Sequence, residues 1–327
     1  MTPELETQIL TCRSLPSLPL AALEVLAASR QEQADLRALA EIIARDPAMA
    51  ARVVAASNAA AFGWGEVTTL PRAVTLLGAN RVLCVVLTFS LLSIRRQGEA
   101  HGFDHGAFWR RSIFAGIAAR ALSEVAGVDA DEALLAGLLQ DFGCLALSEA
   151  LRGAYGQIVR DARGNHWRLY DLEQERLGAT HVEVTGMLAE RWRIPERLRL
   201  AAAVSHIVPR VPPGRLDLGA CVALSGPFAE VWTAPSPADA VADALASGRA
   251  FGQTRETIGG VLARIGALVP EVAAELQVTI TPDEERKRVL AEAQAALERM
   301  RERPGTQMPV EVSGLAGKPD PEEPDAA

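Results

Sequence analysis

Three observations predict an all-α fold for this chain of 327 residues. Leu, Ala, Arg and Glu dominate the composition, whereas aromatic residues make up only 5% of it. Gly and Pro cluster between long runs of helical apolar periodicity, and no alternating β-branched run is long enough to predict a strand. Because 49% of the residues are hydrophobic, the chain can bury a sizeable core, in two modest domains or one large helical one.

Capping residues give the expected helix starts in the first part of the chain. Asp46 offers an N-cap oxygen, and the ring of Pro47 is pre-set for a first turn, so a helix is expected over 48–58. Pro71 begins another short helix. Gly78 can end that helix in the left-handed conformation that glycine adopts easily.

Further helix starts follow in the second part of the chain, each at a side-chain acceptor or a proline. They are Asp129 with Glu132, Thr180 with Glu183 as a capping box, Pro195, Ser236 with Pro237, and Thr281 with Pro282. The first of these helices is expected to reach Gln140, and the second to carry His181. The third is expected to end near His206.

Composition divides the chain into four parts. Residues 1–97 are expected to form an N-terminal helical subdomain, and a polar, Gly-containing joint at 98–105 follows it. The joint begins a second helical set that covers 98–280. Residues 281–303 read as a charged terminal helix, and residues 304–327 are rich in Pro, Gly and acidic residues, which predicts a disordered tail.

The charged terminal helix carries a narrow apolar stripe. Its members are Val289, Leu290, Ala293, Leu297 and Met300. One interpretation is that the stripe docks back on the domain. The alternative is a helix that forms a homodimer or receives a partner helix.

Charge argues against nucleic-acid binding. The formal net charge is −8, from 33 Lys and Arg against 41 Asp and Glu, and no long basic block stands out. Binding to DNA or RNA regardless of sequence needs a basic stripe that neutralises phosphates. A nucleic-acid regulator is therefore disfavoured.

Membrane insertion and secretion are also not expected. The N-terminus lacks the basic and apolar regions of a signal peptide, and the apolar stretch Val82–Leu92 is too short to span a bilayer. The four cysteines lie far apart without a CxxC pair, and three of them read as buried small hydrophobic residues. We expect a cytoplasmic protein without a cofactor.

The polar pair Gln140–Asp141, directly after an apolar helix and before Gly143, is the most informative feature for function. A His-Asp pair here would be the metal-binding centre of a helical phosphohydrolase. In such enzymes imidazole and carboxylate ligands hold a divalent metal, which lowers the pKa of a water and neutralises phosphate oxygens. Gln140 is a much poorer ligand for a transition metal than histidine.

Three residues of the same part of the chain could still be metal ligands. Asp141, His181 and His206 lie on different expected helices, so they can converge. Arg111 stands where the first ligand histidine is expected, and arginine cannot bind a metal because it stays protonated. Its guanidinium would instead replace the metal charge and pair with Asp141.

Each of these residues also has a purely structural interpretation. Asp141 can cap a helix locally or form an ordinary salt bridge, and His181 can be a solvated residue of the first helical turn. His206 can be a helix-end residue before a proline loop. The sequence leaves both interpretations open.

A series of segments in order resembles the successive signatures of the HDOD (HD-related output) domain. They are Leu15–Pro19, Ile42–Ala48, Ala55–Asn58, Arg72–Gly78, Phe108–Ser112, Ala136–Gly143, Glu173–His181 and Glu190–Pro195. The resemblance covers roughly residues 12–230 and includes a histidine at the position of His206. It implies the HDOD fold, in which an N-terminal helical subdomain packs on an HD-like helical bundle.

The resemblance implies a non-catalytic signalling module of bacteria. Members of this family are linked to motility, biofilm and cyclic-di-GMP networks and act mainly by protein contacts. The implied partners are diguanylate cyclases or phosphodiesterases, kinases and receiver proteins. Many members keep a histidine where this chain has Gln140, so the change argues further against catalysis. The alternative is a weak metal-dependent phosphohydrolase of nucleotides or cyclic dinucleotides that uses Asp141, His181 and His206.

Overall fold

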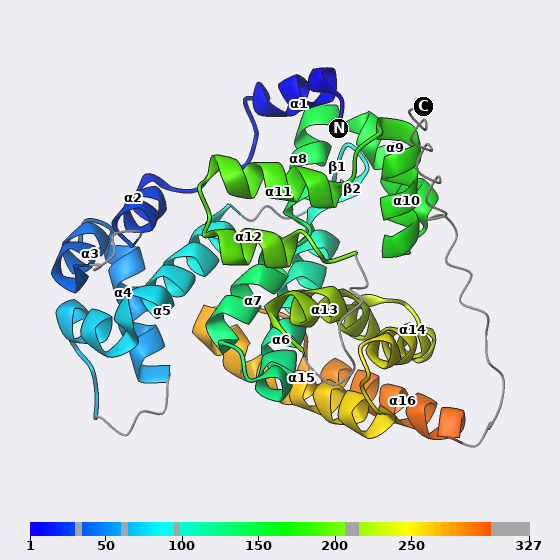
Figure 1. Cartoon of the computed structure of the whole chain (residues 1–327). Coiled ribbons are helices and arrows are strands. Elements are labelled where there is room, and N and C mark those ends of the chain that lie inside the picture. The colour runs from blue at the N-terminus through cyan, green and yellow to red at the C-terminus, as the bar shows by residue number, and fades with distance from the viewer. Residues whose placement is uncertain (30–34, 60–64, 95–98, 207–215, 277, 302–327) are drawn as a thin grey trace, which may run out of the picture.

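The computed structural model describes residues 1–29, 35–59, 65–94, 99–206, 216–276 and 278–301. The predicted all-α class is confirmed, since the regular structure in these ranges is almost entirely helical (Figure 1). The helices are α1 (Pro3–Leu10), α2 (Leu20–Ala28), α3 (Leu36–Ile43), α4 (Pro47–Ala59), α5 (Leu70–Ser93), α6 (His105–Ala126), α7 (Ala130–Leu139), α8 (Phe142–Leu151), α9 (Gly153–Ala162), α10 (His166–Leu177), α11 (His181–Arg191), α12 (Glu196–Ala202), α13 (Leu218–Thr233), α14 (Pro237–Ala250), α15 (Arg255–Leu276) and α16 (Asp283–Arg301). The predicted tail at 304–327 lies outside the described residues.

Most helices begin where the capping residues predict. The Asp46 carboxylate accepts from the backbone N–H groups of Ala48 and Met49 at the start of α4. Asp129 caps α7, and Thr180 forms the predicted capping box with Glu183 at the start of α11. These bonds satisfy backbone donors that a helix start leaves without partners.

The structure differs from the predicted elements at three places. The short helix from Pro71 does end at Gly78, whose φ of 75° is not helical, but a second helix continues directly to Ser93 as the rest of α5. α12 ends at Ala202 rather than near His206. The joint at 98–105 contains an unpredicted pair of two-residue antiparallel strands, β1 (Glu99–Ala100) and β2 (Phe103–Asp104), because Gly102 at positive φ permits a tight turn.

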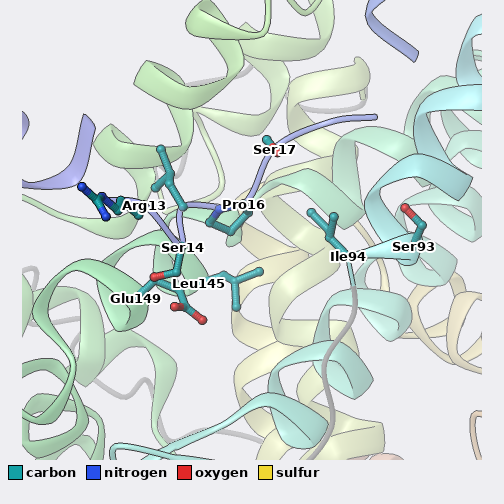
Figure 2. Close-up of a pocket in the computed structure, with 9 residues that line it drawn as sticks. Arg13, Ser14, Pro16, Ser17, Ser93, Ile94, Leu145 and Glu149 are labelled. Atoms are coloured by element: carbon teal, nitrogen blue, oxygen red, sulfur yellow. The ribbon is translucent and has the colours of Figure 1, made fainter. Parts of the chain in front are cut away.

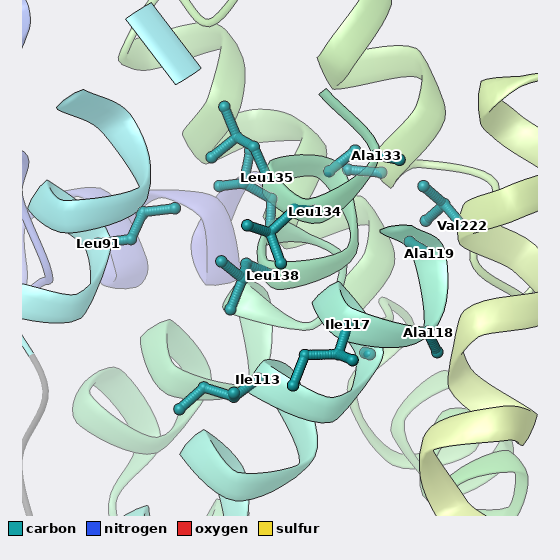
Figure 3. Packing of buried hydrophobic residues seen from close by; sticks show 14 of the residues in the cluster. Leu91, Ile113, Ile117, Ala118, Ala119, Ala133, Leu134, Leu135, Leu138 and Val222 are labelled. Atoms are coloured by element: carbon teal, nitrogen blue, oxygen red, sulfur yellow. The ribbon is translucent and has the colours of Figure 1, made fainter. Parts of the chain in front are cut away.

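The centre of the fold is formed by α6, which packs against α7, α13 and α15. Close approach is possible because small residues lie at the contact: a side chain at Gly137 of α7 would collide with the backbone of Ala115 and Gly116 in α6. Leucines of α7 then meet α5, where Leu91 lies near Leu134 and Leu138 (Figure 3). One hydrophobic core therefore connects the N-terminal helices with the bundle.

Helices α2 to α5 form a group at one side of the molecule (Figure 1). α1 does not join this group but packs on α8, where the Gln8 amide donates to the carbonyl of Ala150. The division of the chain into residues 1–97 and 98–280 stays a prediction, and both α1 and α5 pack across it.

The terminal helix α16 lies on α14 and α15 (Figure 1). Val289, Ala293, Ala296 and Leu297 are buried there. The apolar stripe therefore docks within the chain, which is the first of its two interpretations. A homodimer stays a prediction, but this stripe is not free to form it.

Leu297→Ala is expected to lower the free energy of unfolding by about 2–3 kcal/mol, because the side chain is buried and its loss leaves a cavity. Chemical denaturation measures the change. Gln294→Ala, on the exposed side of the same helix, is the control and is expected to change stability by less than about 0.5 kcal/mol. Equal effects of the two substitutions would show that α16 does not dock as described.

Three helical stretches have the length and mean hydropathy of a membrane span: Leu70–Ser93, Ala130–Leu151 and Arg255–Leu276. The expectation considered only Val82–Leu92, which is itself too short; the first of these stretches contains it, and the other two lie elsewhere in the chain. In the first two stretches 67% and 83% of the window is buried inside the protein, so packing within the fold accounts for their apolar character.

Candidate functional site

The residues singled out in the sequence come from four separate places in the chain and meet in the bundle. Arg111 lies on α6, Gln140 and Asp141 lie at the break between α7 and α8, and His181 begins α11. His206 follows α12 in a turn. A further histidine, His166 at the start of α10, which the sequence analysis did not single out, joins them.

The break between α7 and α8 turns Asp141 toward the interior. Its side chain makes no capping hydrogen bond, so the interpretation of Asp141 as a local cap is wrong. Close packing fixes the break: the N–H of Gly143 donates to the Thr185 hydroxyl at 2.8 Å, and a side chain at Gly143 would collide with the backbone of His181. Glycine at this position thus lets α8 lie directly against α11.

Asp141, His166, His181 and His206 form one cluster. One potential ligand atom from each of the four lies within 4.8 Å of the others. The Asp141 carboxylate is 3.2 Å from Nε2 of His166 and 3.6 Å from Nε2 of His181, which in turn lies 3.0 Å from Nε2 of His206. His181 is completely buried, so it is not a solvated residue of the first turn.

Arg111 occupies the side of this cluster that faces α6 and α13. Its guanidinium donates to the second oxygen of Asp141, whose side chain is only 3% exposed. Its other terminal nitrogen lies 3.7 Å from the Glu230 carboxylate of α13, which is too far for a hydrogen bond. The pair of Arg111 and Asp141 expected from the sequence is therefore present, and the fixed cation sits where a metal ligand was expected.

The side chain of Gln140 points away from the cluster. Its amide donates to the carbonyl of Gly137 and to the hydroxyl of Ser225 on α13. Gln140 thus satisfies neighbouring polar groups, as the sequence suggested, and supplies no atom to the histidines.

A chain of hydrogen bonds orients His181 from behind. The Glu173 carboxylate lies 2.6 Å from Nδ1 of His181 and also accepts from its backbone N–H. The hydroxyl of Tyr155 donates to the other oxygen of Glu173 at 2.6 Å. Both oxygens of this completely buried carboxylate are therefore occupied, and Nε2 of His181 is aimed at the cluster.

The three histidines differ in charge state. Burial and the nearby Arg111 lower the pKa of His166 well below its ordinary value, and burial together with the neighbouring histidines does the same to the pKa of His206. Burial alone would lower the pKa of His181, but Cys144 and the Glu173 carboxylate act in the opposite direction and raise it to about 10. At neutral pH the cluster holds one imidazolium and two neutral imidazoles.

Protein stability is expected to peak near pH 6.5, the ordinary histidine pKa. A histidine with a raised pKa binds more protons when folded, so His181 loses its contribution as the pH rises from about 6.5 to about 10. His166 and His206 bind fewer protons when folded, so stability also falls as the pH drops below about 6.5. Urea unfolding between pH 5 and 9 measures both limbs, each on the order of a few kcal/mol.

Glu173→Gln tests the origin of the alkaline limb. It keeps the shape of the side chain but removes one of the two groups that raise the pKa of His181. The variant is expected to show a shallower decline above pH 6.5, because Cys144 is unchanged, and to keep the acid limb. A wild-type protein of constant stability between pH 6.5 and 9 would contradict the assignment.

A cavity of about 250 Å³ opens beside the cluster. Arg111, Asp141, His166 and Glu230 are among its polar lining residues, and side chains such as Phe108 contribute its apolar walls. A larger hollow of about 370 Å³ lies elsewhere, between the segment before α2, the end of α5 and α8 (Figure 2). None of the cluster residues lines that hollow, so the smaller cavity is the one that belongs to the candidate site.

The types of donor atom in the cluster suit a divalent transition metal. Three imidazoles and a carboxylate are common ligands of such ions, and a carboxylate behind a ligand histidine, like Glu173 behind His181, is a common outer partner. The charges do not suit it. Asp141 is the single carboxylate of the four residues, and Arg111 already pairs with it. In this geometry the residues do not fit a metal ion.

Three residues of the site were not predicted from the sequence: His166, Glu173 and Glu230. His166 could have been found from its spacing, because His166, Leu169 and Glu173 fall on one face of a helix and the latter two are buried. Glu173 was noted as part of a motif, without a role. Glu230 had no signal, since nothing in the sequence shows that α13 brings it next to Arg111.

Comparison with solved structures supports the fold. A candidate phosphohydrolase from Shewanella amazonensis SB2B has a TM-score of 0.61 at 22% identity, covering 86% of this chain and 97% of that one. An HDOD domain protein of unknown function from Geobacter sulfurreducens has a TM-score of 0.53 at 18% identity, covering 91% and 97%. A candidate signal transduction protein from Marinobacter aquaeolei VT8 has a TM-score of 0.51 at 18% identity, covering 91% and 64%. At these identities the likeness concerns the fold alone.

No curated protein matches the chain. The family model of the HDOD domain matches residues 15–208, which is more than half of the chain. The match includes Arg111 and the whole cluster of Asp141, His166, His181 and His206. On this evidence the chain belongs to the HDOD domain family.

Proposed function

We propose that this protein is a non-catalytic, cytoplasmic signalling module that acts by binding other proteins. The observation that carries the proposal is the ion pair between Arg111 and Asp141. A metal-dependent hydrolase of this fold needs the Asp141 carboxylate as a metal ligand. Here the guanidinium of Arg111 pairs with that carboxylate instead. The cluster is then a closed set of polar side chains rather than a site for phosphate chemistry.

The hydrogen bonds around the pair support a structural role for the cluster. Asp141 contacts Arg111, His166 and His181, which come from α6, α10 and α11. A buried carboxylate with three such partners ties three helices together. The HD-like bundle would serve as a rigid scaffold, and its outer surface would contact the partner.

The partner is expected to be another signalling protein, such as a diguanylate cyclase, a phosphodiesterase, a kinase or a receiver protein. Membership of the HDOD family and the name of the Marinobacter relative support this part of the proposal. Crosslinking in the native host followed by affinity capture tests it. Repeated recovery of one such protein is expected, and capture of none above the background would contradict it.

Metal analysis and hydrolysis assays test the absence of catalysis. Protein purified from its host without chelators is expected to hold far less than one transition metal ion per chain. It is also expected to leave nucleotides and cyclic dinucleotides intact at high protein concentration. Stoichiometric Mn, Fe, Ni or Zn that is lost in Asp141→Ala, together with hydrolysis, would overturn the proposal.

A metal-dependent phosphohydrolase is the second candidate, and one observation favours it. The cluster gathers four ligand-type side chains, one more than the Asp141, His181 and His206 expected from the sequence, with Glu173 behind His181. A metal bound there would activate a water and neutralise phosphate oxygens. For this function Arg111 would have to leave Asp141, so activity should rise in Arg111→Ala when Mn²⁺ is added.

A further inference from the structure

The cavity beside the cluster carries more negative than positive charge. Asp104, Asp141 and Glu230 contribute three carboxylates to its lining, whereas Arg111 is the single guanidinium among the lining residues. His166 also lines the cavity, and its Nε2 lies 3.2 Å from the Asp141 carboxylate. The lining would therefore repel an anionic ligand and attract a cationic one.

Glu230 is the lining carboxylate with unused hydrogen-bonding capacity. Asp104 caps α6 through its carboxylate, and Asp141 is held by Arg111 and His166. The Glu230 side chain is only 17% exposed, and its one ion-pair contact among the described residues is the 3.7 Å approach to Arg111. A mostly buried carboxylate without a close donor is stabilised when a charged donor reaches it. The cavity therefore presents an acceptor whose nearest charged partner among the described residues stays 3.7 Å away.

The walls around these charges are largely apolar. They are formed by Phe103, Ala107, Phe108, Val159, Ala162, Leu169, Ala234 and Pro235. The rings of Phe103 and Phe108 lie 5.7 Å apart and give one wall an aromatic character. A volume of about 250 Å³ is small for a ligand site, so it suits a compact apolar body rather than a nucleotide.

We propose that this cavity binds a small organic cation, with one ammonium or guanidinium group on a compact apolar body. The cationic group lies on Glu230, and the apolar body lies against Phe108 and the other walls. This inference rests on the proposed function, because a metal ion in the adjacent cluster would repel such a ligand. The bound cation would be the small-molecule input of the signalling module. Because Arg111 also approaches Glu230, the cation would change the charge around the pair of Arg111 and Asp141.

Three matched compounds test the charge selectivity by calorimetry on the full chain at pH 7. They are 2-phenylethylammonium, its neutral isostere 2-phenylethanol, and the anion phenylacetate. The ammonium compound is expected to bind roughly tenfold or more tightly than the alcohol, because it adds a charge-assisted hydrogen bond. Phenylacetate is expected to show no binding. An anion that binds as well as the ammonium compound would overturn the proposal.

Glu230→Gln tests the residue and keeps the shape of the side chain. The variant is expected to lose roughly tenfold or more in ammonium affinity and to keep its affinity for 2-phenylethanol, which also reports that the cavity is intact. Glu190→Gln, at an exposed position of α11, is the control and should bind like the wild type. Unchanged ammonium binding in Glu230→Gln would contradict the assignment.

Metal analysis of the same preparation separates this inference from the proposed function. Metal-free protein that binds no ammonium compound would refute the inference and leave the non-catalytic proposal standing. Protein with stoichiometric metal that binds none would refute both. Metal-free protein that binds the ammonium compound through Glu230 would support both.

Discussion

Arg111→Met is expected to lower the free energy of unfolding by roughly 3 kcal/mol, the largest stability effect that we predict for a single substitution. The methionine keeps part of the apolar stem but leaves the Asp141 carboxylate without its cation in a place that is 3% exposed. Urea unfolding at pH 7 measures the change. A second readout is the pKa of His166, which should rise toward its ordinary value because Arg111 is one of the causes that lower it.

The neighbouring Arg110 provides a matched control. It pairs with Glu285 at 2.6 Å, but both side chains are about one third exposed, so the solvent screens the pair. Arg110→Met is expected to cost less than about 1 kcal/mol. Asp141→Asn should also destabilise the protein, and the double variant with Arg111→Met should cost less than the sum of the two by more than about 1 kcal/mol. Additive effects would show that the two residues do not act as a pair.

The fold could be predicted where local chemistry decides it. Asp46, Asp129, Thr180 and Ser236 each begin a helix because their side-chain oxygens accept from free backbone N–H groups nearby in the sequence. The misses depend on distant contacts or on backbone conformation. The hairpin around Gly102 is one example. Gly156 of α9 packs directly on the backbone of His101, and this contact between distant parts of the chain leaves no local signal in the sequence.

The candidate site was predictable in its chemistry but not in its full membership. The ion pair of Asp141 and Arg111 could be predicted because a buried carboxylate needs a cation, and the structure has that pair. His166 was missed because its helix start, capped by Asn165, looks like an ordinary first turn, although the residue lies beside Asp141 in space. Glu230 lies 119 positions after Arg111 in the sequence, and only the packing of α13 on α6 brings the two side chains together.

Converting Arg111 and Gln140 to histidine is expected to create a metal site in this bundle. Arg111→His removes the fixed cation from Asp141 and adds an imidazole on α6, and Gln140→His adds another directly before Asp141. The cluster would then offer up to five imidazoles and a carboxylate that is free to bind an ion. Metal analysis after purification should show a rise to about one transition metal ion per chain, with an affinity at least about 100-fold above that of the wild type.

The control for this experiment is Arg110→His combined with Gln140→His. It adds the same number of imidazoles but leaves Arg111 on Asp141, so it should take up no more metal than the wild type. If the control also binds metal, the ligand at position 140 matters and the fixed charge does not. If neither variant binds metal, the helices hold the ligands in a geometry that excludes an ion even without Arg111. Uptake by the variant with Arg111→His and Gln140→His, but not by the control, would assign the difference to position 111, where the substitution frees Asp141 from the guanidinium and adds an imidazole.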